Sequence, residues 1–204
     1  MRGWFGTVAL LASGCALWLM PAEAAGGHES ETAVLAGGCY WGVESVFRHV
    51  KGVEEVVSGL AGGSPVRMGH GNSTRADAAE AVRIRFDPDQ ITFEQLLNIF
   101  FLVVHDPTQM NRQGPDIGER YRSAIFPQNA QQREIVERYL STLRASRRFA
   151  KPVVTKVERG SFEAADKDQQ DFVRKHPNSP YVLAYDLPKL RQMRSEYPAL
   201  WKDD

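Results

Sequence analysis

The chain has 204 residues, with 25 basic and 25 acidic side chains and no formal net charge at pH 7. This balance argues against a nucleic-acid-binding protein or a polybasic membrane binder, because both need an excess of Lys and Arg. The length suits one domain with a substantial core, and a hydrophobic content of 43% is ordinary for a globular protein.

The first 24 residues are predicted to be a signal peptide. Arg2 supplies a short positive region, and an apolar run follows from Trp4 to Met20. Ala22 and Ala24 place small residues at the two positions that a signal peptidase reads, so cleavage after Ala24 is expected. The mature protein would then be exported, and the periplasm is the expected compartment.

Two alternatives to cleavage remain open. The stretch "LASGC" resembles a weak lipoprotein signal with Cys15 as the acylated residue, although Ala12 stands where Leu is usual. The apolar run could also stay uncut as a single N-terminal anchor, although it is short for a membrane span.

After a polar linker over residues 25–32, one catalytic domain is predicted over residues 33–204. Its first element is a short buried strand over 33–38 that ends in a glycine turn. A helical spacing of apolar residues over 41–50 comes next, followed by a turn and strand over 52–63 that again end in glycine.

The next elements have clear patterns. Strict alternation over 80–86 predicts a strand with Val82, Ile84 and Phe86 on one face. Thr92 is the expected N-cap of an apolar helix over 92–105.

The remainder of the chain also alternates between strands and helices, which indicates a single α/β (α+β) domain. We expect a long loop over 106–118, a strand over 120–126, a helix over 130–143, a strand over 152–158, a helix over 162–176, and a proline-punctuated tail with a last short helix over 177–204.

Cys39 is the only cysteine that remains after the predicted cleavage. An odd cysteine in an exported protein is a candidate reactive thiol. It follows two glycines and precedes a helix, so the helix N-terminus is expected to favour its thiolate, which is the nucleophilic form. The alternative is an inert cysteine buried at a helix start.

Three further residues are candidates for the same site. Tyr40 and Trp41 either pack in the core or form an apolar wall that could hold a methyl or thioether group. Glu80 shares the strand parity of Val82 and Ile84, so its carboxyl either is buried, with a raised pKa that keeps it a proton donor near pH 7, or reaches solvent at the strand start.

The long loop adds polar candidates. Asp116 and Tyr121 bring a carboxylate and a phenol that can hydrogen-bond a polar substrate. Arg120 and Arg122 are expected to be surface charges.

His105 and Asp106 allow a Cys–His–Asp hydrolase to be imagined. A histidine at a helix end that satisfies backbone carbonyls is the commoner case. The five histidines show no metal-ligand spacing, so no metal site is expected.

Five stretches in the same order, "GGCYWGVES", "SGLAGG", "AEAVRIRFDP", "HDPTQMNRQGPDIGERYRSAIF" and "HPNSPYVLAYDLPKL", together resemble the A-type peptide methionine-S-sulfoxide reductases. The resemblance covers nearly the whole mature chain. It implies a ferredoxin-like α/β sandwich with a mixed sheet, and a reaction that needs no metal or organic cofactor.

The resemblance also implies the chemistry of methionine-S-sulfoxide reduction, in free or protein-bound form, as a repair of oxidative damage. Cys39 attacks the sulfoxide sulfur, Glu80 protonates the departing oxygen, and Cys39 is left as a sulfenic acid. Tyr40 and Trp41 hold the methyl group.

Asp116 and Tyr121 are implied to orient the oxygen or the backbone of the substrate. The sequence departs from the family pattern around this pocket. Leu60 and Ala78 replace a usual tyrosine and histidine, and "DQQ" at 168–170 replaces "YHQ". The tyrosine of the usual "PTY" stretch has no clear match, and Met68 falls near it, with His70 close by.

The chain has no resolving cysteine of the kind that many members carry, so an external thiol is expected to reduce the sulfenic acid. The expected partners are oxidised methionine-containing proteins or peptides and a thioredoxin-fold reductant, and a monomer is expected. Two alternatives are a family relative that binds methionine sulfoxide with impaired catalysis, and a different one-cysteine thiol enzyme.

Overall fold

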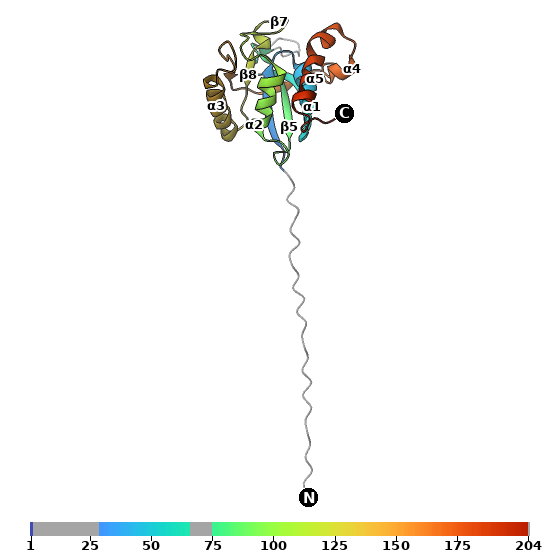
Figure 1. Ribbon diagram of the computed structural model, residues 1–204. Coiled ribbons are helices and arrows are strands. Elements are labelled where there is room, and N and C mark those ends of the chain that lie inside the picture. The colour runs from blue at the N-terminus through green and yellow to red at the C-terminus, as the bar shows by residue number, and fades with distance from the viewer. Residues whose placement is uncertain (2–28, 66–74, 204) are drawn as a thin grey trace.

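A six-stranded mixed sheet lies at the centre of the fold (Figure 1). The computed structural model describes residue 1, residues 29–65 and residues 75–203. The strand order is β10-β2-β5-β1-β8-β9, and every neighbouring pair is antiparallel except β8 with β9, which is parallel. The strands are β1 (Glu31–Gly37), β2 (Val53–Ala61), β5 (Ala79–Phe86), β8 (Ser123–Ile125), β9 (Lys156–Val157) and β10 (Phe162–Ala164).

Two short ribbons lie outside this sheet. One pairs β3 (Ser64–Pro65) with β4 (Arg75–Ala76), and the other pairs β6 (Arg112–Gln113) with β7 (Asp116–Ile117). The second ribbon belongs to the long loop that the sequence indicated, and it carries Asp116.

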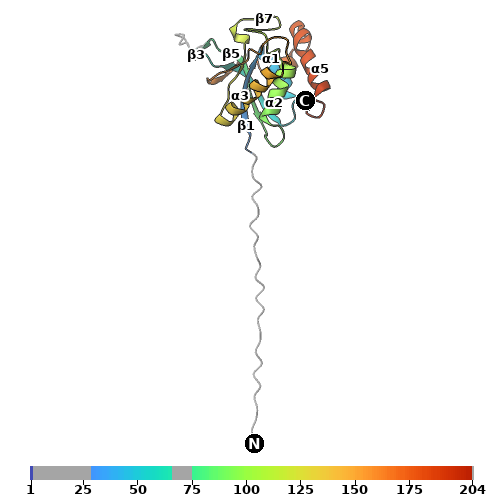
Figure 2. The same ribbon diagram turned by 60° about the vertical axis from the view of Figure 1, so that its left-hand side comes forward.

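Helices cover the sheet in two groups. The helix α2 runs into a π-helical segment, η1, and lies beside α3, whereas α1 contacts α4, η3 and α5 (Figures 1 and 2). The helical elements are α1 (Tyr40–Arg48), α2 (Phe93–Ile99), η1 (Phe100–Val104), the 3₁₀ turn η2 (Glu119–Tyr121), α3 (Ala130–Ala145), α4 (Phe172–Lys175), the π-helical η3 (Val182–Asp186) and α5 (Leu187–Glu196). None of the helices in the described ranges combines the length and apolar character needed to cross a bilayer.

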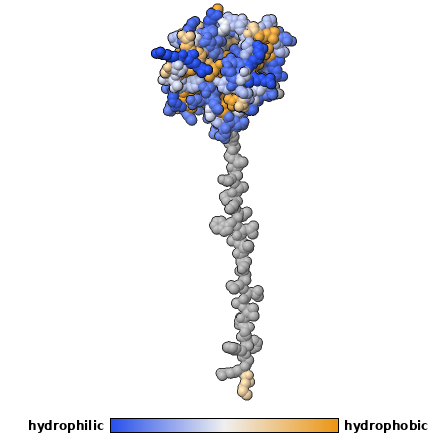
Figure 3. Space-filling model, viewed as in Figure 1, coloured by the Kyte–Doolittle hydropathy of each residue, from blue (hydrophilic) through white to orange (hydrophobic). Residues whose placement is uncertain are grey.

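The main core lies between the sheet and the helices. On β5, Val82, Ile84 and Phe86 are fully buried in the large apolar cluster that also contains the inner residues of α1 and α2. Ala79 and Ala81 belong to a smaller cluster on the opposite face of the sheet. Most large apolar side chains are therefore internal, and the face of the domain seen in Figure 3 is mostly hydrophilic with small scattered apolar patches.

The predicted α/β domain with a mixed sheet is confirmed, and so are its first strand, its first two helices and the strand that contains Glu80. The domain begins slightly earlier than predicted, because β1 takes in Glu31 and Thr32 of the expected linker. The strand expected over 152–158 is shorter and comprises Lys156–Val157.

The helix predicted over 162–176 is wrong. Its first residues form β10, which pairs antiparallel with the end of β2, and only Phe172–Lys175 is helical. The Phe162 ring packs against the smaller apolar cluster, and the Arg83 guanidinium lies 5.3 Å from its centroid. Gly59 permits this approach, since a Cβ there would lie 2.2 Å from the Glu163 carbonyl oxygen. Tertiary pairing has overridden local helix propensity.

Candidate active site

Cys39 lies between β1 and α1, where it is the N-cap of the helix and a free thiol. Gly38, just before it, has φ of +94°, and a Cβ there would lie 2.5 Å from the Cβ of Gln113. Glycine is thus required both by the backbone conformation and by the loop that packs on it. The Cys39 side chain is 8% exposed, so the thiol sits below the surface.

The electrostatic environment of Cys39 differs from the sequence-based prediction. The backbone N–H of Trp41, in the first turn of α1, lowers the pKa of the thiol as predicted, and so does the Tyr181 hydroxyl. Burial and the nearby Glu80 carboxylate outweigh these donors and raise the pKa of Cys39 to about 12. The balance of these groups therefore favours the thiol over the thiolate.

Glu80 takes the buried one of the two positions that the sequence left open, with 7% exposure. Its Oε2 accepts a hydrogen bond of 3.3 Å from the Tyr40 backbone N–H, next to Cys39. Burial raises the pKa of Glu80 to about 7, and the Asp116 charge adds to this, while the Tyr40 N–H and Arg120 oppose it. A carboxyl with this pKa can donate a proton near neutral pH.

The two arginines that were expected to be surface charges differ in their surroundings. Arg120 is exposed as expected, and its Nε also lies 3.9 Å from Glu80 Oε1. Arg122 is buried rather than exposed, and it pairs with Glu158 at 2.8 Å. Leu60 lies directly opposite Glu80 in the register of β2 with β5, so an apolar side chain stands beside the carboxyl.

Asp116 and Tyr121 both reach the neighbourhood of Glu80. Asp116 accepts a hydrogen bond from the hydroxyl of Tyr181, and its charge contributes to the raised pKa of Glu80. Burial and the charges of Glu80, Asp116 and Cys39 raise the pKa of Tyr121. Both residues that were predicted to bind a polar group are thus placed near the thiol and the acid.

Tyr40 and Trp41 stand at the start of α1 and are held by the C-terminal part of the chain. The Trp41 Nε1–H donates to Gln169 Oε1 at 3.2 Å, and the Tyr40 hydroxyl donates to the same oxygen at 3.4 Å. Phe172 stacks on the Trp41 ring at 3.6 Å between centroids, and Tyr181 meets this ring edge-on at 5.8 Å. Both rings are therefore fixed beside the thiol by Gln169, Phe172 and Tyr181. That they hold a methyl group stays a prediction.

The structure brings together all six residues that the sequence singled out: Cys39, Tyr40, Trp41, Glu80, Asp116 and Tyr121. Sequence reasoning gave no role to Tyr181 or Phe172, and it placed Gln169 near the pocket only as part of the altered "DQQ" stretch at 168–170. Tyr181 lies within a stretch that contributed to the family resemblance, but it received no role there. Gln169 and Phe172 lie in the segment that was predicted as a helix, which would not have placed them against Trp41.

Two further expectations concern residues outside this group. His105 is buried, and its ring nitrogens contact the Phe100 carbonyl at 2.8 Å and the Ser123 hydroxyl at 2.7 Å. Asp106 accepts from the backbone and hydroxyl of Thr108, so neither residue forms a triad with Cys39. His105 has the structural role that the sequence favoured.

The position expected to replace the missing family tyrosine, with Met68 and His70, lies outside the described residues. Within the part of the chain that the structure describes, no group of three or more His, Cys, Asp or Glu side chains could hold a metal ion. That the reaction needs no metal or organic cofactor stays a prediction.

The family model for peptide methionine sulfoxide reductase matches residues 31–200, which is most of the chain. This chain belongs to the peptide methionine sulfoxide reductase family. Family membership makes it an oxidoreductase that reduces methionine sulfoxide in a thiol-dependent reaction.

Curated relatives agree with this assignment. A peptide methionine sulfoxide reductase, MsrA 2, of Mesorhizobium japonicum is 43% identical over 180 residues, which covers 85% of this chain and 91% of the relative. The MsrA 2 of Synechocystis sp. is 43% identical over 171 residues, covering 82% of this chain and 80% of the relative.

Solved structures of family members share the fold. Methionine sulfoxide reductase A of Corynebacterium diphtheriae is 33% identical, with a TM-score of 0.60 over 74% of this chain and 77% of that one. Reduced Mxr1 of Saccharomyces cerevisiae is 26% identical, with a TM-score of 0.61 over 74% of this chain and 88% of that one.

Proposed function

We propose that this reductase acts on the S epimer of methionine sulfoxide, free or in proteins, with Cys39 as nucleophile and Glu80 as proton donor. The observation that carries the proposal is the joint placement of these groups. The Tyr40 N–H that binds Glu80 directly follows Cys39, and the Glu80 charge raises the pKa of the Cys39 thiol.

The chemical step balances with these two residues. Cys39 sulfur attacks the sulfoxide sulfur, and protonated Glu80 gives its proton to the sulfoxide oxygen. The S–O bond of the substrate breaks, methionine leaves in reduced form, and the oxygen ends on Cys39 as a sulfenic acid. The proton of the Cys39 thiol replaces the one that Glu80 gave, so the step needs no net proton from solvent.

The surrounding side chains support this step. Tyr40 and Trp41 supply apolar surface for the methyl group. The Tyr121 hydroxyl, near Glu80 and Cys39, can donate a second hydrogen bond to the sulfoxide oxygen. Asp116 holds the Tyr181 phenol by hydrogen bonding, so its contribution to substrate orientation passes through that ring.

The cycle is completed by thiols from outside the chain. One thiol attacks the Cys39 sulfenic acid, releasing water and leaving a mixed disulfide, and a second thiol frees Cys39 and leaves as a disulfide. Beyond residue 24 the sequence offers no second cysteine for this task. A thioredoxin-fold dithiol protein supplies both thiols in one partner, and oxidised methionine-containing proteins or peptides are the substrates.

We place this reaction outside the cytoplasm, with cleavage after Ala24 and a monomeric mature protein in the periplasm. The sequence of the first 24 residues supports this location. The N-terminal sequence of the protein recovered from a periplasmic extract should begin at Ala25. A protein that stays with the membrane, acylated at Cys15 or uncut, would contradict it.

The proposed function is tested with each sulfoxide epimer and dithiothreitol as reductant. We expect turnover of the S epimer and none of the R epimer, and we expect Cys39→Ser to abolish turnover. Failure to consume the S epimer would contradict the proposal, and binding of it without consumption would indicate a family relative with impaired catalysis.

A further inference from the structure

Glu44 is a buried carboxylate of α1 to which the proposed chemistry gives no role. Its side chain is 1% exposed, which is rare for a glutamate. It follows Trp41 by three residues, so the two side chains lie on the same face of the helix. That face is turned toward the segment 169–172, which supports the Trp41 ring.

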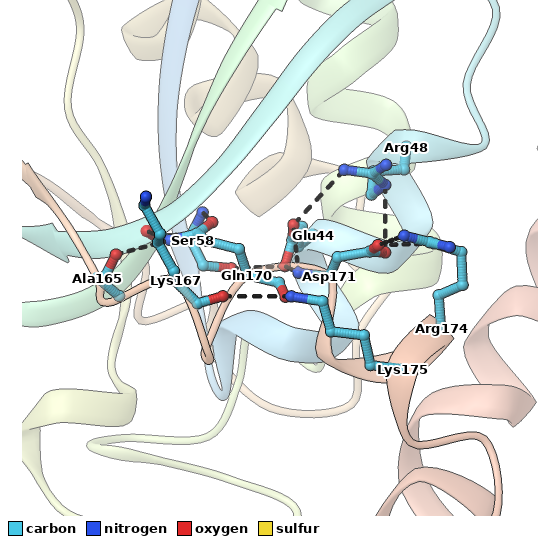
Figure 4. A network of polar contacts seen from close by, with 9 residues as sticks. All are labelled: Glu44, Arg48, Ser58, Ala165, Lys167, Gln170, Asp171, Arg174 and Lys175. Atoms are coloured by element: carbon cyan, nitrogen blue, oxygen red, sulfur yellow. Dashed lines mark hydrogen bonds and ion pairs between the residues drawn. The ribbon is translucent and has the colours of Figure 1, made fainter.

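Glu44 is the centre of a polar network between α1, β2 and this segment (Figure 4). Its Oε2 accepts a hydrogen bond of 2.9 Å from the Ser58 hydroxyl, and both of its oxygens lie 2.9 Å from the Asp171 backbone nitrogen, which donates to them. The Arg48 guanidinium approaches to 3.8 Å. A buried carboxylate is retained at acceptable cost only when donors satisfy it in this way.

Gln170 ties the same segment to the sheet. Its Oε1 accepts from the Ser58 backbone N–H at 2.8 Å, and its Nε2 donates to the Ser58 carbonyl at 2.8 Å and to the Ala165 carbonyl at 3.0 Å. Ser58 is thus bound through its backbone by Gln170 and through its hydroxyl by Glu44. We call Glu44, Ser58, Gln170 and Asp171 the clasp.

The residues on either side of the clasp hold the aromatic wall. Gln169 accepts from the indole of Trp41 and the hydroxyl of Tyr40, and Phe172 stacks on Trp41 with an angle of 7° between the rings. Gln170 and Asp171 therefore bind α1 and β2, while the residues that flank them contact the two rings. Asp171 has φ of +57°, a left-handed conformation that changes the direction of the chain just before Phe172.

We propose that Glu44 is a positioning residue that, through the clasp, sets the place of the Trp41 ring and so the selectivity of the site for an S-methyl sulfoxide. This inference rests on the proposed function, in which Trp41 walls the methyl group. Loss of the Glu44 carboxylate leaves the Asp171 N–H and the Ser58 hydroxyl without their acceptor. The segment then loosens, and the ring that it supports no longer excludes a larger alkyl group.

The experiment compares N-acetylmethionine sulfoxide with N-acetylethionine sulfoxide, whose S-alkyl group is one carbon longer, in the full-length protein with dithiothreitol. For Glu44→Ala we expect kcat/KM for the methyl substrate to fall about tenfold, mainly through KM, as for displaced positioning groups. The kcat/KM for the ethyl substrate should fall less, so the ratio of kcat/KM for the methyl substrate to that for the ethyl substrate (the methyl-to-ethyl ratio) falls. Glu44→Gln keeps an acceptor oxygen and should restore most of the ratio.

A matched control separates positioning from general destabilisation. Gln132 of α3 is 2% exposed. Its Oε1 accepts from the Gln128 N–H and its Nε2 donates to the Thr32 carbonyl of β1, and these partners lie outside the clasp. Gln132→Ala should lower the thermal midpoint while the methyl-to-ethyl ratio stays at the wild-type value. Should Glu44→Ala not fold, Ser58→Ala removes one donor of the clasp and should lower the ratio in the same direction.

Amide hydrogen exchange of residues 169–172 gives a readout that does not depend on turnover. Faster exchange together with a lower ratio in Glu44→Ala supports the proposal. Provided that the wild type reduces the methyl substrate, unchanged exchange in Glu44→Ala overturns the proposal. Faster exchange with an unchanged methyl-to-ethyl ratio overturns it as well. A wild-type protein that reduces neither sulfoxide contradicts the proposed function, and the positioning role with it.

Discussion

At the scale of single residues, the chemistry depends on two protons that lie close together. Burial and the Glu80 charge keep the Cys39 thiol protonated, and burial raises the pKa of Glu80 to about 7. Glu80 therefore has two opposite effects. As an acid it gives the proton that the sulfoxide oxygen needs, and as an anion it opposes the thiolate.

This dual role predicts opposite changes in Glu80→Gln. Methionine sulfoxide turnover should fall about 10²–10⁴-fold, because an amide has no acidic proton to give. Alkylation of Cys39 by iodoacetamide at pH 8 should become faster, since wild-type Glu80 is ionised there and its charge holds the pKa of Cys39 high. Mass spectrometry of the alkylated peptide follows the second rate.

Glu119→Gln is the matched control, because Glu119 is an exposed carboxylate one residue from Arg120. It should change neither rate. If Glu80→Gln slows alkylation as well as turnover, the charge of Glu80 does not govern the thiol.

His105 gives a stability prediction. Burial lowers its pKa from 6.5 to about 4, so the folded state binds fewer protons than the unfolded state between these values. Stability from this residue is present above pH 6.5 and is lost as the pH falls toward 4. The loss between pH 7 and pH 5 is about 2 kcal/mol.

Urea unfolding at pH 7 and pH 5 measures this effect in the wild type and in His105→Gln. From pH 7 to pH 5, the free energy of unfolding of the variant should fall by about 2 kcal/mol less than that of the wild type. The buried acids, whose pKa values are raised, contribute with the opposite sign to both proteins and cancel in this comparison. An identical pH dependence in both proteins would mean that His105 titrates normally.

The sequence could assign Glu80 to the apolar face of its strand, because strand alternation fixes which face a side chain occupies, although it left burial and solvent exposure as alternatives. The raised pKa of Cys39 could not be predicted from the sequence. The local pattern shows the helix N-terminus, which favours the thiolate, but not the burial of the sulfur or the approach of Glu80 from another strand. These effects are the larger ones.

At the scale of elements, the turn before α1 determines where the thiol lies. Gly38→Ala should destabilise the protein by about 1–3 kcal/mol and lower turnover, because φ of +94° is strained for alanine and its Cβ would collide with Gln113. Denaturant unfolding and the steady-state rate test both effects.

Gly114→Ala is an informative comparison for this change. Gly114 also has positive φ, +57°, but a Cβ there meets nothing within 4 Å. It should cost less stability and keep the wild-type rate. Equal losses in the two variants would show that backbone strain alone, and not contact with Gln113, makes Gly38 necessary.

The segment 162–176 shows why one element was mispredicted. Its composition permits a helix, and no local signal marks Phe162–Ala164 as a strand. The decisive contacts come from elsewhere: the free edge of β2, Gly59 opposite Glu163, and the Glu44 carboxylate that binds the Asp171 N–H. Propensity over a short window cannot include partners so distant in the chain.

At the scale of the whole molecule, the sheet and its helices followed from alternation, helical spacing and glycine turns, and these patterns were sufficient for the fold class. The site is assembled from four separate parts of the chain: 39–41, Glu80, 116–121 and 169–181. The first three carried residue types with recognisable chemistry. The last contributed aromatic and amide groups that become functional only through their packing on Trp41.

The most direct test of Cys39 as the nucleophile is a single turnover without reductant. The reduced mature protein, which begins at Ala25 and has Cys39 as its one cysteine, is mixed with excess methionine-S-sulfoxide, and released methionine is counted while mass spectrometry follows the peptide that contains Cys39. We predict one methionine per protein molecule and a Cys39 that has gained one oxygen as the sulfenic acid. No release of methionine, or release with Cys39 unmodified, would contradict the proposal.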